Sequence, residues 1–340
     1  MRKQLAWYVH CMRKLSMRRL LNLFKLWLSF HVSKTLSRPF VWGAPAAIAI
    51  EPTTACNLRC PECPSGLRQF SRPTGNLSVE LYRRMIDEVA PQALFLTLYF
   101  QGEPYLHPHF FELVDYARRK GLFTITSTNG HFLDSRRAHL TVVSGLDRLI
   151  ISIDGVTQQS YAAYRKGGKL KQVLEGIQEV IHWKKELDSL TPEIVLQFLV
   201  VRPNEHEIPA VRQLAKEVGA DRLVLKTAQI YDFENGSPLI PTIERYSRYR
   251  RLPNGKYSIK NPLKNQCWRM WNGFVMTWDG RLVPCCFDKD AQHQMGQFPR
   301  QSIKDIWYSP TYQHFRQQLL HARKNIDICR NCSEGLKVWS

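Results

Sequence analysis

Acidic residues are missing from the first fifty positions of this 340-residue chain, and the first of them is Glu51. The same fifty positions carry nine Lys or Arg, so nearly half of the formal net charge of +19 lies there. A basic surface spread over the whole molecule, as nucleic-acid-binding proteins carry, is therefore not expected. RNA binding or RNA modification remains a minor alternative.

A long apolar run is also missing. The stretch 20–30 is interrupted by polar residues and is shorter than the roughly 20 apolar residues that cross a bilayer. Leu20, Leu23, Phe24, Trp27 and Leu28 nevertheless recur at helical spacing, with polar residues on the opposite face. A basic amphipathic helix of this kind lies on an anionic membrane surface, docks on a partner, or packs against its own domain.

Cysteine is not scarce, but its distribution excludes a small disulfide-stapled secreted domain. The nine cysteines fall in local groups within a long chain, and no convincing cleavable signal precedes them. Metal ligation in a reducing cytoplasm is the better account. The chain has no internal repeat, and its length suffices for one large core plus a small appended part.

From Ala46 onward, short β-branched or aromatic runs alternate with amphipathic segments, a pattern typical of βα units around a parallel sheet. Several of the amphipathic segments end at Gly or Pro, as helices do. The sequence therefore predicts an α/β fold with a partial (β/α)6 barrel of the TIM type. The expected strands are 46–51, 94–100, 122–127, 149–153, 194–201 and 222–226, and the expected helices are 79–89, 109–120, 135–143, 170–186 and 207–218.

This rhythm fails after Ala228. Residues 231–262 are rich in Tyr, Arg, Pro, Asn and Gly, which indicates a linker or lid. Beyond it, Asp279-Gly280 between two apolar runs predicts a hairpin, and 302–324 is expected to be mostly helical. The predicted divisions are a basic amphipathic segment at 1–45, the barrel at 46–228, the linker or lid at 229–262, and a cysteine-rich module at 263–340.

Three cysteines follow the first expected strand, where the loops of a barrel carry catalytic groups. Cys56, Cys60 and Cys63 are spaced Cys-x3-Cys-x2-Cys. Three thiolates on a four-iron cubane leave one iron free to chelate amino and carboxylate groups, and reduction of the cubane supplies an electron. A zinc site is the alternative, but zinc usually takes four grouped ligands, and no fourth Cys or His is near in sequence.

The segment 56–64, Cys-Asn-Leu-Arg-Cys-Pro-Glu-Cys-Pro, resembles the signature of the radical S-adenosylmethionine (SAM) superfamily. Two departures are Gln101, in place of the first glycine of the family's Gly-Gly-Glu-Pro segment, and Glu62, where members usually have a bulky residue beside the adenine. The resemblance implies that the backbone of 102–104 hydrogen-bonds the amino group of the methionine part of SAM. It also implies that Ser152 and Arg165, at and after the fourth strand, bind the SAM carboxylate, a task that suits a guanidinium. The end of the third strand is placed to reach the ribose, with an ordinary turn as the alternative. The implied SAM contacts are Gly102, Glu103, Pro104, Ser127, Thr128, Asn129, Ser152, Asp154 and Arg165.

Four cysteines near the C-terminal end resemble the SPASM/twitch extension, whose short form uses four cysteines for one auxiliary [4Fe–4S] cluster. A zinc ribbon is the alternative for such a set on its own. Cys11 and Cys286 remain, and a free cysteine is usually a small buried apolar residue. Asp288 lies close behind Cys286, where related maturases have an acidic residue that takes up the substrate proton, and is the candidate base. The four implied ligands are Cys267, Cys285, Cys329 and Cys332.

The resemblance implies cleavage of SAM to a 5′-deoxyadenosyl radical that abstracts hydrogen from a substrate. We expect a net oxidation or modification of a small molecule such as a sugar, polyol or membrane-linked compound, with maturation of a ribosomal peptide or protein as the alternative. A flavodoxin or ferredoxin-type electron donor is implied, in the cytoplasm or at the inner membrane face. Lys226 and Gln197 are expected to point into the barrel, toward substrate or as ordinary core polarity, and His107 and His109 to start a helix.

Overall fold

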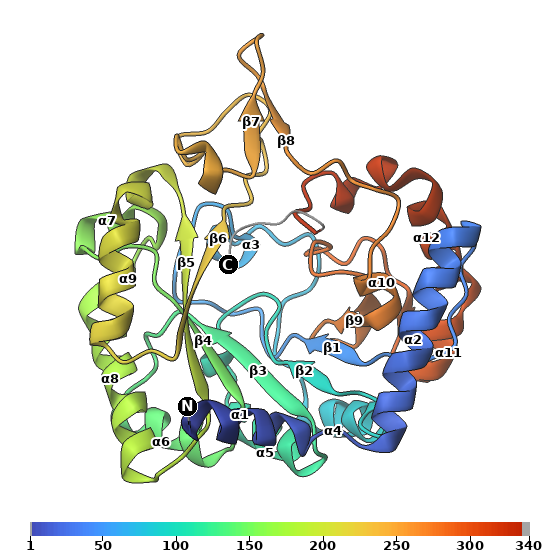
Figure 1. Cartoon of the computed structure of the whole chain (residues 1–340), viewed down its shortest axis with the longest axis horizontal. Coiled ribbons are helices and arrows are strands. Elements are labelled where there is room, and N and C mark those ends of the chain that lie inside the picture. Colours follow the sequence, from blue (N-terminus) through green and yellow to red (C-terminus); the bar gives the residue numbers. More distant parts are fainter. Residues whose placement is uncertain (1, 335–340) are drawn as a thin grey trace.

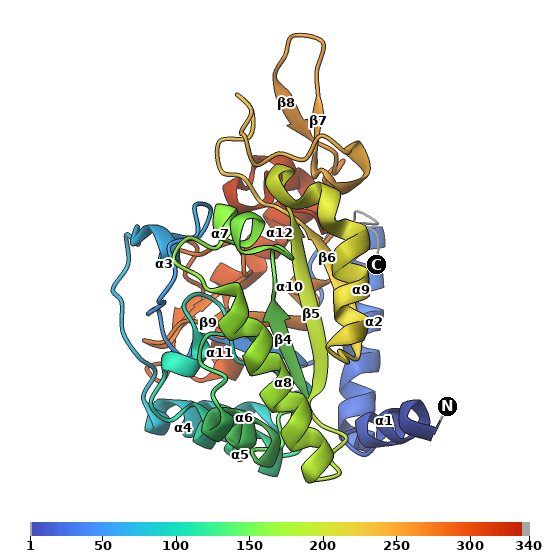
Figure 2. The same cartoon turned by 90° about the vertical axis from the view of Figure 1, so that its left-hand side faces the viewer.

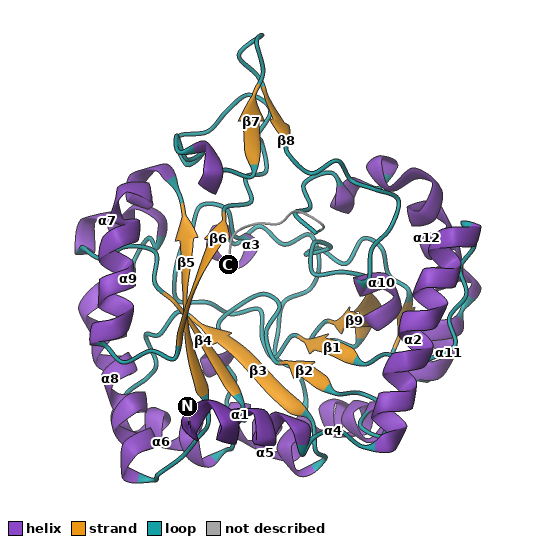
Figure 3. Cartoon of the chain, in the orientation of Figure 1, coloured by secondary structure: helices purple, strands orange, loops and turns teal. Residues whose placement is uncertain are grey.

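The structure is a computed structural model that describes residues 2–334; residue 1 and residues 335–340, the end of the predicted C-terminal module, lie outside the described residues. Within the described part, one curved sheet has the strand order β11-β10-β9-β1-β2-β3-β4-β5-β6. Neighbouring strands from β1 to β6 are all parallel. Figures 1 and 3 show these strands inside an outer layer of helices. The predicted partial barrel is confirmed.

All six predicted strands and all five predicted barrel helices are present, with small shifts at their ends. Two further helices, α3 and α7, lie in the loops after the first and fourth strands. The strands are β1 (Ala47–Ile50), β2 (Phe95–Thr97), β3 (Phe123–Thr128), β4 (Arg148–Ser152), β5 (Glu193–Val200) and β6 (Arg222–Thr227). The helices are α3 (Pro64–Leu67), α4 (Val79–Val89), α5 (Phe110–Arg119), α6 (Ser135–Val143), α7 (Gln158–Tyr164), α8 (Leu170–Glu186) and α9 (Ile208–Glu217).

Side-chain alternation in the strands separates a helix-facing layer from the lumen of the barrel. Phe198 of β5 and Leu225 of β6 belong to the buried core under the helices. Because successive strand residues point to opposite faces, the neighbouring Gln197 and Lys226 point into the lumen, as predicted. Gln197 is half-buried and Lys226 is exposed, so the lumen is accessible to water at these two residues.

The cysteine-rich module continues the barrel sheet. Its first strand, β9 (Gly273–Met276), pairs in parallel with β1, and the predicted hairpin joins β9 to β10 (Arg281–Val283). A Cβ atom at Gly273 would lie 1.6 Å from the Ala47 carbonyl oxygen, so only glycine permits this close pairing. The module also contains β11 (Gly296–Gln297), α10 (Arg269–Asn272), and the expected helices α11 (Ile303–Tyr308) and α12 (Pro310–Ala322).

The predicted linker or lid contains a small hairpin, β7 (Tyr249–Arg251) with β8 (Tyr257–Ile259), which projects beyond the barrel at the top of Figure 1. The base of this hairpin is anchored on both sides. The Tyr249 hydroxyl accepts from the Ile230 N–H at 2.8 Å and donates to Asn331 Oδ1 at 2.8 Å. The segment therefore joins the end of the barrel to the module.

Two helices precede the barrel, α1 (Arg2–Met12) and α2 (Met17–Leu36). Helix α1 covers the end where the parallel strands begin: the Trp7 ring lies 5.8 Å from the Phe123 ring, and Asp147 pairs with His10 and Lys14. Figure 2 shows α1 and α2 on one side of the molecule and α3 on the other. No helix in residues 2–334 is long and apolar enough to cross a bilayer.

Candidate active site and auxiliary cysteine centre

The loop after β1 brings Cys56, Cys60 and Cys63 to the mouth of the barrel. Cys60 is buried and the other two are half-buried. The loop is anchored by the Leu58 side chain, which is buried and 1% exposed. A 3.0 Å hydrogen bond from the Arg59 N–H to the Lys166 carbonyl also holds it. Burial raises the pKa of the Cys56 thiol to about 11, and the nearby Cys63 and Cys60 add to the shift. The three predicted ligands are therefore neighbours.

The Gly102-Glu103 segment packs directly on the cysteine loop. The Glu103 N–H donates to the Ala55 carbonyl at 2.7 Å, and the Gly102 N–H donates to Ser65 Oγ at 2.8 Å. Gly102 has φ +74°, and a Cβ there would lie 2.3 Å from the Thr53 carbonyl oxygen. A glycine is thus required for the two loops to share one surface.

The Glu103 carboxylate organises the loop after β3, a function that sequence reasoning missed. It accepts from the Thr128 hydroxyl and from the Asn129 N–H, both at 2.7 Å, and from the Tyr105 N–H at 3.2 Å. Burial raises the pKa of this carboxyl to about 7, although the three hydrogen bonds act to lower it. The Thr128 hydroxyl is thus engaged inside the protein. So is the Asn129 amide, which donates to Asn57 Oδ1 at 2.7 Å and lies 4.0 Å from Cys56 Sγ. Pro104 is buried and starts the following 3-10 turn.

Arg165 stands beside the cysteine loop. Its Nη1 lies 3.9 Å from Cys60 Sγ, and its Nε donates to the fully buried Asp154. The other Asp154 oxygen accepts from the Leu199 N–H at 2.7 Å, which ties the pair to β5. Burial disfavours the charge of Arg165, but Asp154 and Cys60 outweigh it and raise the pKa of the guanidinium well above its ordinary value. Ser127 is the last residue but one of β3, and Ser152 ends the adjacent strand β4.

A second group of cysteines gathers from distant parts of the module. Arg323 lies among them: its Nη2 donates to Cys332 Sγ at 3.5 Å, and its buried Nε has no hydrogen-bond partner within residues 2–334. Burial raises the pKa of Cys267 to about 12 and that of Cys329 to about 11. Three of the four cysteines are buried, the fourth being half-buried; the set is Cys267, Cys285, Cys329 and Cys332.

Both sets fit iron–sulfur clusters. All donors are thiols, a guanidinium lies beside each set, and Arg323, whose Nε has no hydrogen-bond partner within residues 2–334, lies near Cys267, Cys329 and Cys332. Within the described residues, no three His, Cys, Asp or Glu side chains converge closely enough for a single metal ion. Thiolates that bind one zinc ion all lie about 2.3 Å from that ion. The thiolates of a cubane each bind a different iron, so their sulfur atoms need not converge on one metal. The cluster interpretation is favoured over zinc.

Two short chains of contacts tie the barrel to the module and to the lid segment. Glu51 forms a buried bidentate pair with Arg72, at 2.6 and 2.8 Å, and the Arg72 Nε donates to the Lys289 carbonyl of the module. Glu62, the departure beside the expected adenine position, accepts from the Tyr231 N–H at 2.9 Å and so holds the lid segment to the cysteine loop. The barrel is thereby tied to the module and to the lid segment.

The remaining predicted residues lie apart from the cysteine loop. The Asp288 carboxylate is buried and accepts from the Gln292 and His293 N–H groups, both at 2.8 Å. These bonds shape its own loop, and its role as a base stays a prediction. His109 precedes α5 as its N-cap, and the His107 ring hydrogen-bonds the Leu77 carbonyl, so the expected helix start is confirmed.

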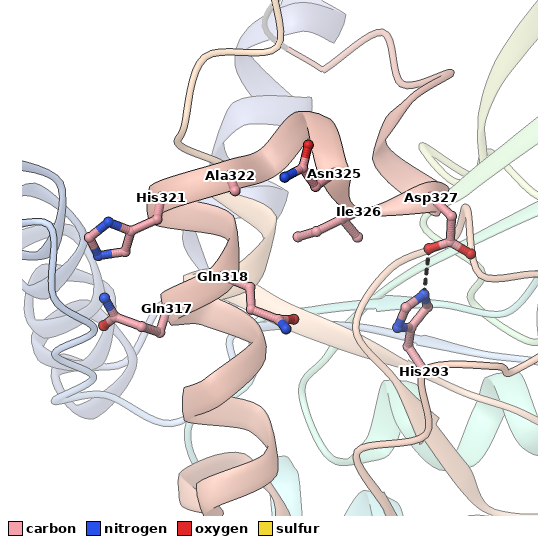
Figure 4. Close-up of a pocket in the computed structure, with 8 residues that line it drawn as sticks. All are labelled: His293, Gln317, Gln318, His321, Ala322, Asn325, Ile326 and Asp327. Carbon is pink, nitrogen blue, oxygen red and sulfur yellow. Dashed lines mark hydrogen bonds and ion pairs between the residues drawn. The ribbon is translucent and has the colours of Figure 1, made fainter.

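A surface hollow lies beside the second site, between α12 and the loop that carries His293 (Figure 4). His293 and Asp327 form an ion pair at 2.6 Å on its rim. Asp327 is two residues from Cys329, but none of the predicted site residues lines the hollow.

Two family models match the sequence. The Radical SAM superfamily matches residues 50–206, which contain the cysteine loop and Arg165. This chain belongs to the radical SAM superfamily. The iron–sulfur cluster-binding domain called SPASM matches residues 267–333, which contain all four cysteines of the second site. SAM and two [4Fe–4S] clusters are accordingly the cofactors of this radical SAM protein.

Similarity to curated proteins extends over much of the chain. The PqqA peptide cyclase of Bradyrhizobium diazoefficiens is 29% identical over 227 residues, which are 65% of this chain but only 57% of that protein. A tungsten-containing aldehyde ferredoxin oxidoreductase cofactor-modifying protein of Pyrococcus furiosus is 26% identical over 297 residues, 78% of this chain and 82% of the relative. Streptococcus suis SuiB, solved with its precursor peptide SuiA, shares the fold with a TM-score of 0.63, at 12% identity over 88% of this chain and 73% of SuiB.

Proposed function

We propose that this protein reductively cleaves SAM and uses the resulting 5′-deoxyadenosyl radical to abstract hydrogen from a substrate. The observation that carries the proposal is the position of Arg165, 3.9 Å from Cys60 Sγ, at a loop with three cysteine ligands. Three thiolates leave one iron without a protein ligand, and a bound cluster supplies that iron and the electron. A guanidinium at this place suits the carboxylate of SAM.

The residues around the loop have separable tasks in this proposal. Asp154 holds Arg165 and is itself pinned to β5. The backbone of Gly102 and Glu103 lies against the cysteine loop, and we assign this backbone to the methionine amino group. The Glu103 carboxylate fixes the backbone of Asn129. We assign the side chain of Asn129, which donates to Asn57 Oδ1 at 2.7 Å, to the ribose. These assignments extend the predicted SAM contacts to the carboxylate of Glu103 as a positioning group.

For the substrate we propose a peptide or protein, so the protein would be a maturase. Support comes from the relative named as a peptide cyclase, and the shared fold with SuiB is compatible with it. The small-molecule oxidation that the sequence favoured is the second candidate, because another relative is named as a cofactor-modifying protein. The auxiliary cluster would accept an electron or organise the substrate in either case.

We also propose a cytoplasmic protein that receives electrons from a flavodoxin or a ferredoxin. All nine cysteines are free thiols in the structure. Exposed or cluster-binding thiols persist in a reducing compartment, and a low-potential donor is needed to reduce such a cluster.

Release of 5′-deoxyadenosine tests the reaction. Anaerobically reconstituted protein with dithionite and SAM should release 5′-deoxyadenosine and methionine even without substrate, and Cys60→Ala should abolish the release because two cysteines cannot hold the cubane. Cys11→Ala is the matched control, since this half-buried thiol lies in α1, remote in sequence from both sites, and it should behave as wild type. Release that persists in reconstituted Cys60→Ala would contradict the assignment.

The substrate class is tested by stimulation of that release. Extract of the producing cells, separated by size, should contain a factor that accelerates 5′-deoxyadenosine formation. A factor that is destroyed by protease supports the maturase. A small, protease-resistant factor would instead establish the small-molecule alternative.

A further inference from the structure

Helix α2 buries mainly polar side chains and leaves several large apolar side chains exposed to solvent, although Leu26 is buried and Leu23 and Phe30 pack partly against the core. Amphipathic helices of globular proteins normally pack the other way. Asn22 and Ser29, on the polar side of the sequence pattern, are buried, while Leu20, Phe24 and Trp27 of the apolar side are exposed. The buried residues of the helix are Arg19, Asn22, Leu26, Ser29 and Ser33.

The inward polar residues are fully used in hydrogen bonds. Arg19 donates to the Ala90, Lys120 and Gly121 carbonyls at 2.6–3.1 Å, at the C-terminal ends of α4 and α5, where a cation is favoured. The Asn22 side chain donates to the Ala44 carbonyl and accepts from the Ala44 N–H. These bonds set the rotation of α2, so the apolar side cannot turn inward without losing them.

The outward side forms a continuous apolar row. Phe24 is 58% exposed and Trp27 is 51% exposed, and their rings stack 6.2 Å apart. A 20-residue helix is about 30 Å long, and the row from Met17 to Trp27 lies along about the first half of one side of α2. Exposed apolar residues of α1 precede it in the chain. The exposed apolar residues of the two helices up to Trp27 are Tyr8, Val9, Met12, Met17, Leu20, Leu21, Phe24 and Trp27.

All charged side chains of residues 1–50, which contain this row, are basic. Five exposed Lys or Arg lie in the described part of this segment, and the whole segment before Glu51 has no acidic residue. Two copies of such a surface would repel each other, which argues against a symmetric dimer through it. A surface of phosphate groups over an apolar layer complements both the charge and the apolar row. The five residues are Arg13, Arg18, Lys25, Lys34 and Arg38.

We propose that α1 and α2 dock this protein on an anionic phospholipid membrane, with Phe24 and Trp27 inserted at the boundary between headgroups and acyl chains. Helix α2 then lies flat in the interface while its polar side holds the barrel. This docking goes beyond the proposed SAM chemistry and does not depend on it.

Vesicle co-sedimentation of the full-length, reconstituted protein tests the docking. At low salt the protein should pellet with vesicles of equal parts phosphatidylglycerol and phosphatidylcholine, and far less with pure phosphatidylcholine. Phe24→Ser/Trp27→Ser should weaken the partition coefficient about tenfold or more. Arg18→Gln and Lys25→Gln should each weaken it about fivefold, since a basic residue near such a surface contributes on this scale.

Point substitutions are preferable to deletion of the segment, because deletion would remove Arg19 and the core residue Leu26. The matched control is Leu187→Ser/Leu190→Ser, which removes two leucines of similar exposure after α8 and should bind vesicles as wild type does. Equal pelleting with both vesicle types at low salt would overturn the proposal. So would equal binding by the Phe24/Trp27 variant, or a dimer in solution that this variant converts to monomer.

Discussion

Arg165→Gln separates the structural role of the guanidinium from its proposed role in binding SAM. The change leaves the fully buried Asp154 carboxylate facing no cation, although it still accepts from the Leu199 N–H. Removing one partner of a buried ion pair costs about 3–5 kcal/mol of stability. Loss of a charge-assisted hydrogen bond to the SAM carboxylate should cost about 1.5–3 kcal/mol, which is roughly a ten- to hundredfold weaker affinity.

The double variant Asp154→Asn/Arg165→Gln divides these two effects. The asparagine keeps an oxygen for the Leu199 N–H and removes the unpaired charge. Most of the lost stability should therefore return, whereas the affinity for SAM should remain low. Anaerobic thermal melts report the first quantity, and equilibrium dialysis with SAM reports the second, on protein with full iron content.

Two outcomes would refute this reasoning. SAM binding within twofold of wild type in both variants would show that Arg165 does not hold the cofactor. A double variant as unstable as Arg165→Gln would show that the buried charge of Asp154 is not the source of the loss.

Two further predictions concern the iron content and the contacts of α1 with the end of the barrel where the strands begin. Reconstituted protein should contain about eight irons per chain. The double variant Cys329→Ala/Cys332→Ala should contain half as much iron, whereas Cys11→Ala should contain as much as wild type. Full iron content in the double variant would show that Cys329 and Cys332 are not ligands. Burial opposes ionisation of Asp147, but its bonds to His10 and Lys14 prevail and lower its pKa below 3.8, so its contribution to stability is present above pH 3.8 and is lost as the pH falls through the lowered pKa. Asp147→Asn should therefore lower the melting temperature at neutral pH, and this deficit should shrink below pH 3.8; a deficit that is the same at both pH values would contradict the ion-pair account.

Local patterns predicted the elements of the barrel well. The end of a helix and the alternation of a strand depend on a few neighbouring residues, which is why 79–89 and 135–143 coincide with α4 and α6. The hairpin at Asp279-Gly280 is of the same kind. The pattern was insufficient where two segments meet from far apart: nothing near Gly273 indicates that β9 joins β1, since this depends on the fit between two backbones.

The sequence by itself determined the chemistry of this protein, because Cys-x3-Cys-x2-Cys places three ligands in one loop wherever that loop lies. The tertiary structure alone decided how Glu103 and Glu62 are used, since their partners Asn129 and Tyr231 are distant in sequence. It also decided which side of α2 faces outward. Periodicity identifies two sides of a helix, but the carbonyls that bind Arg19 belong to helix ends that only the folded barrel brings together.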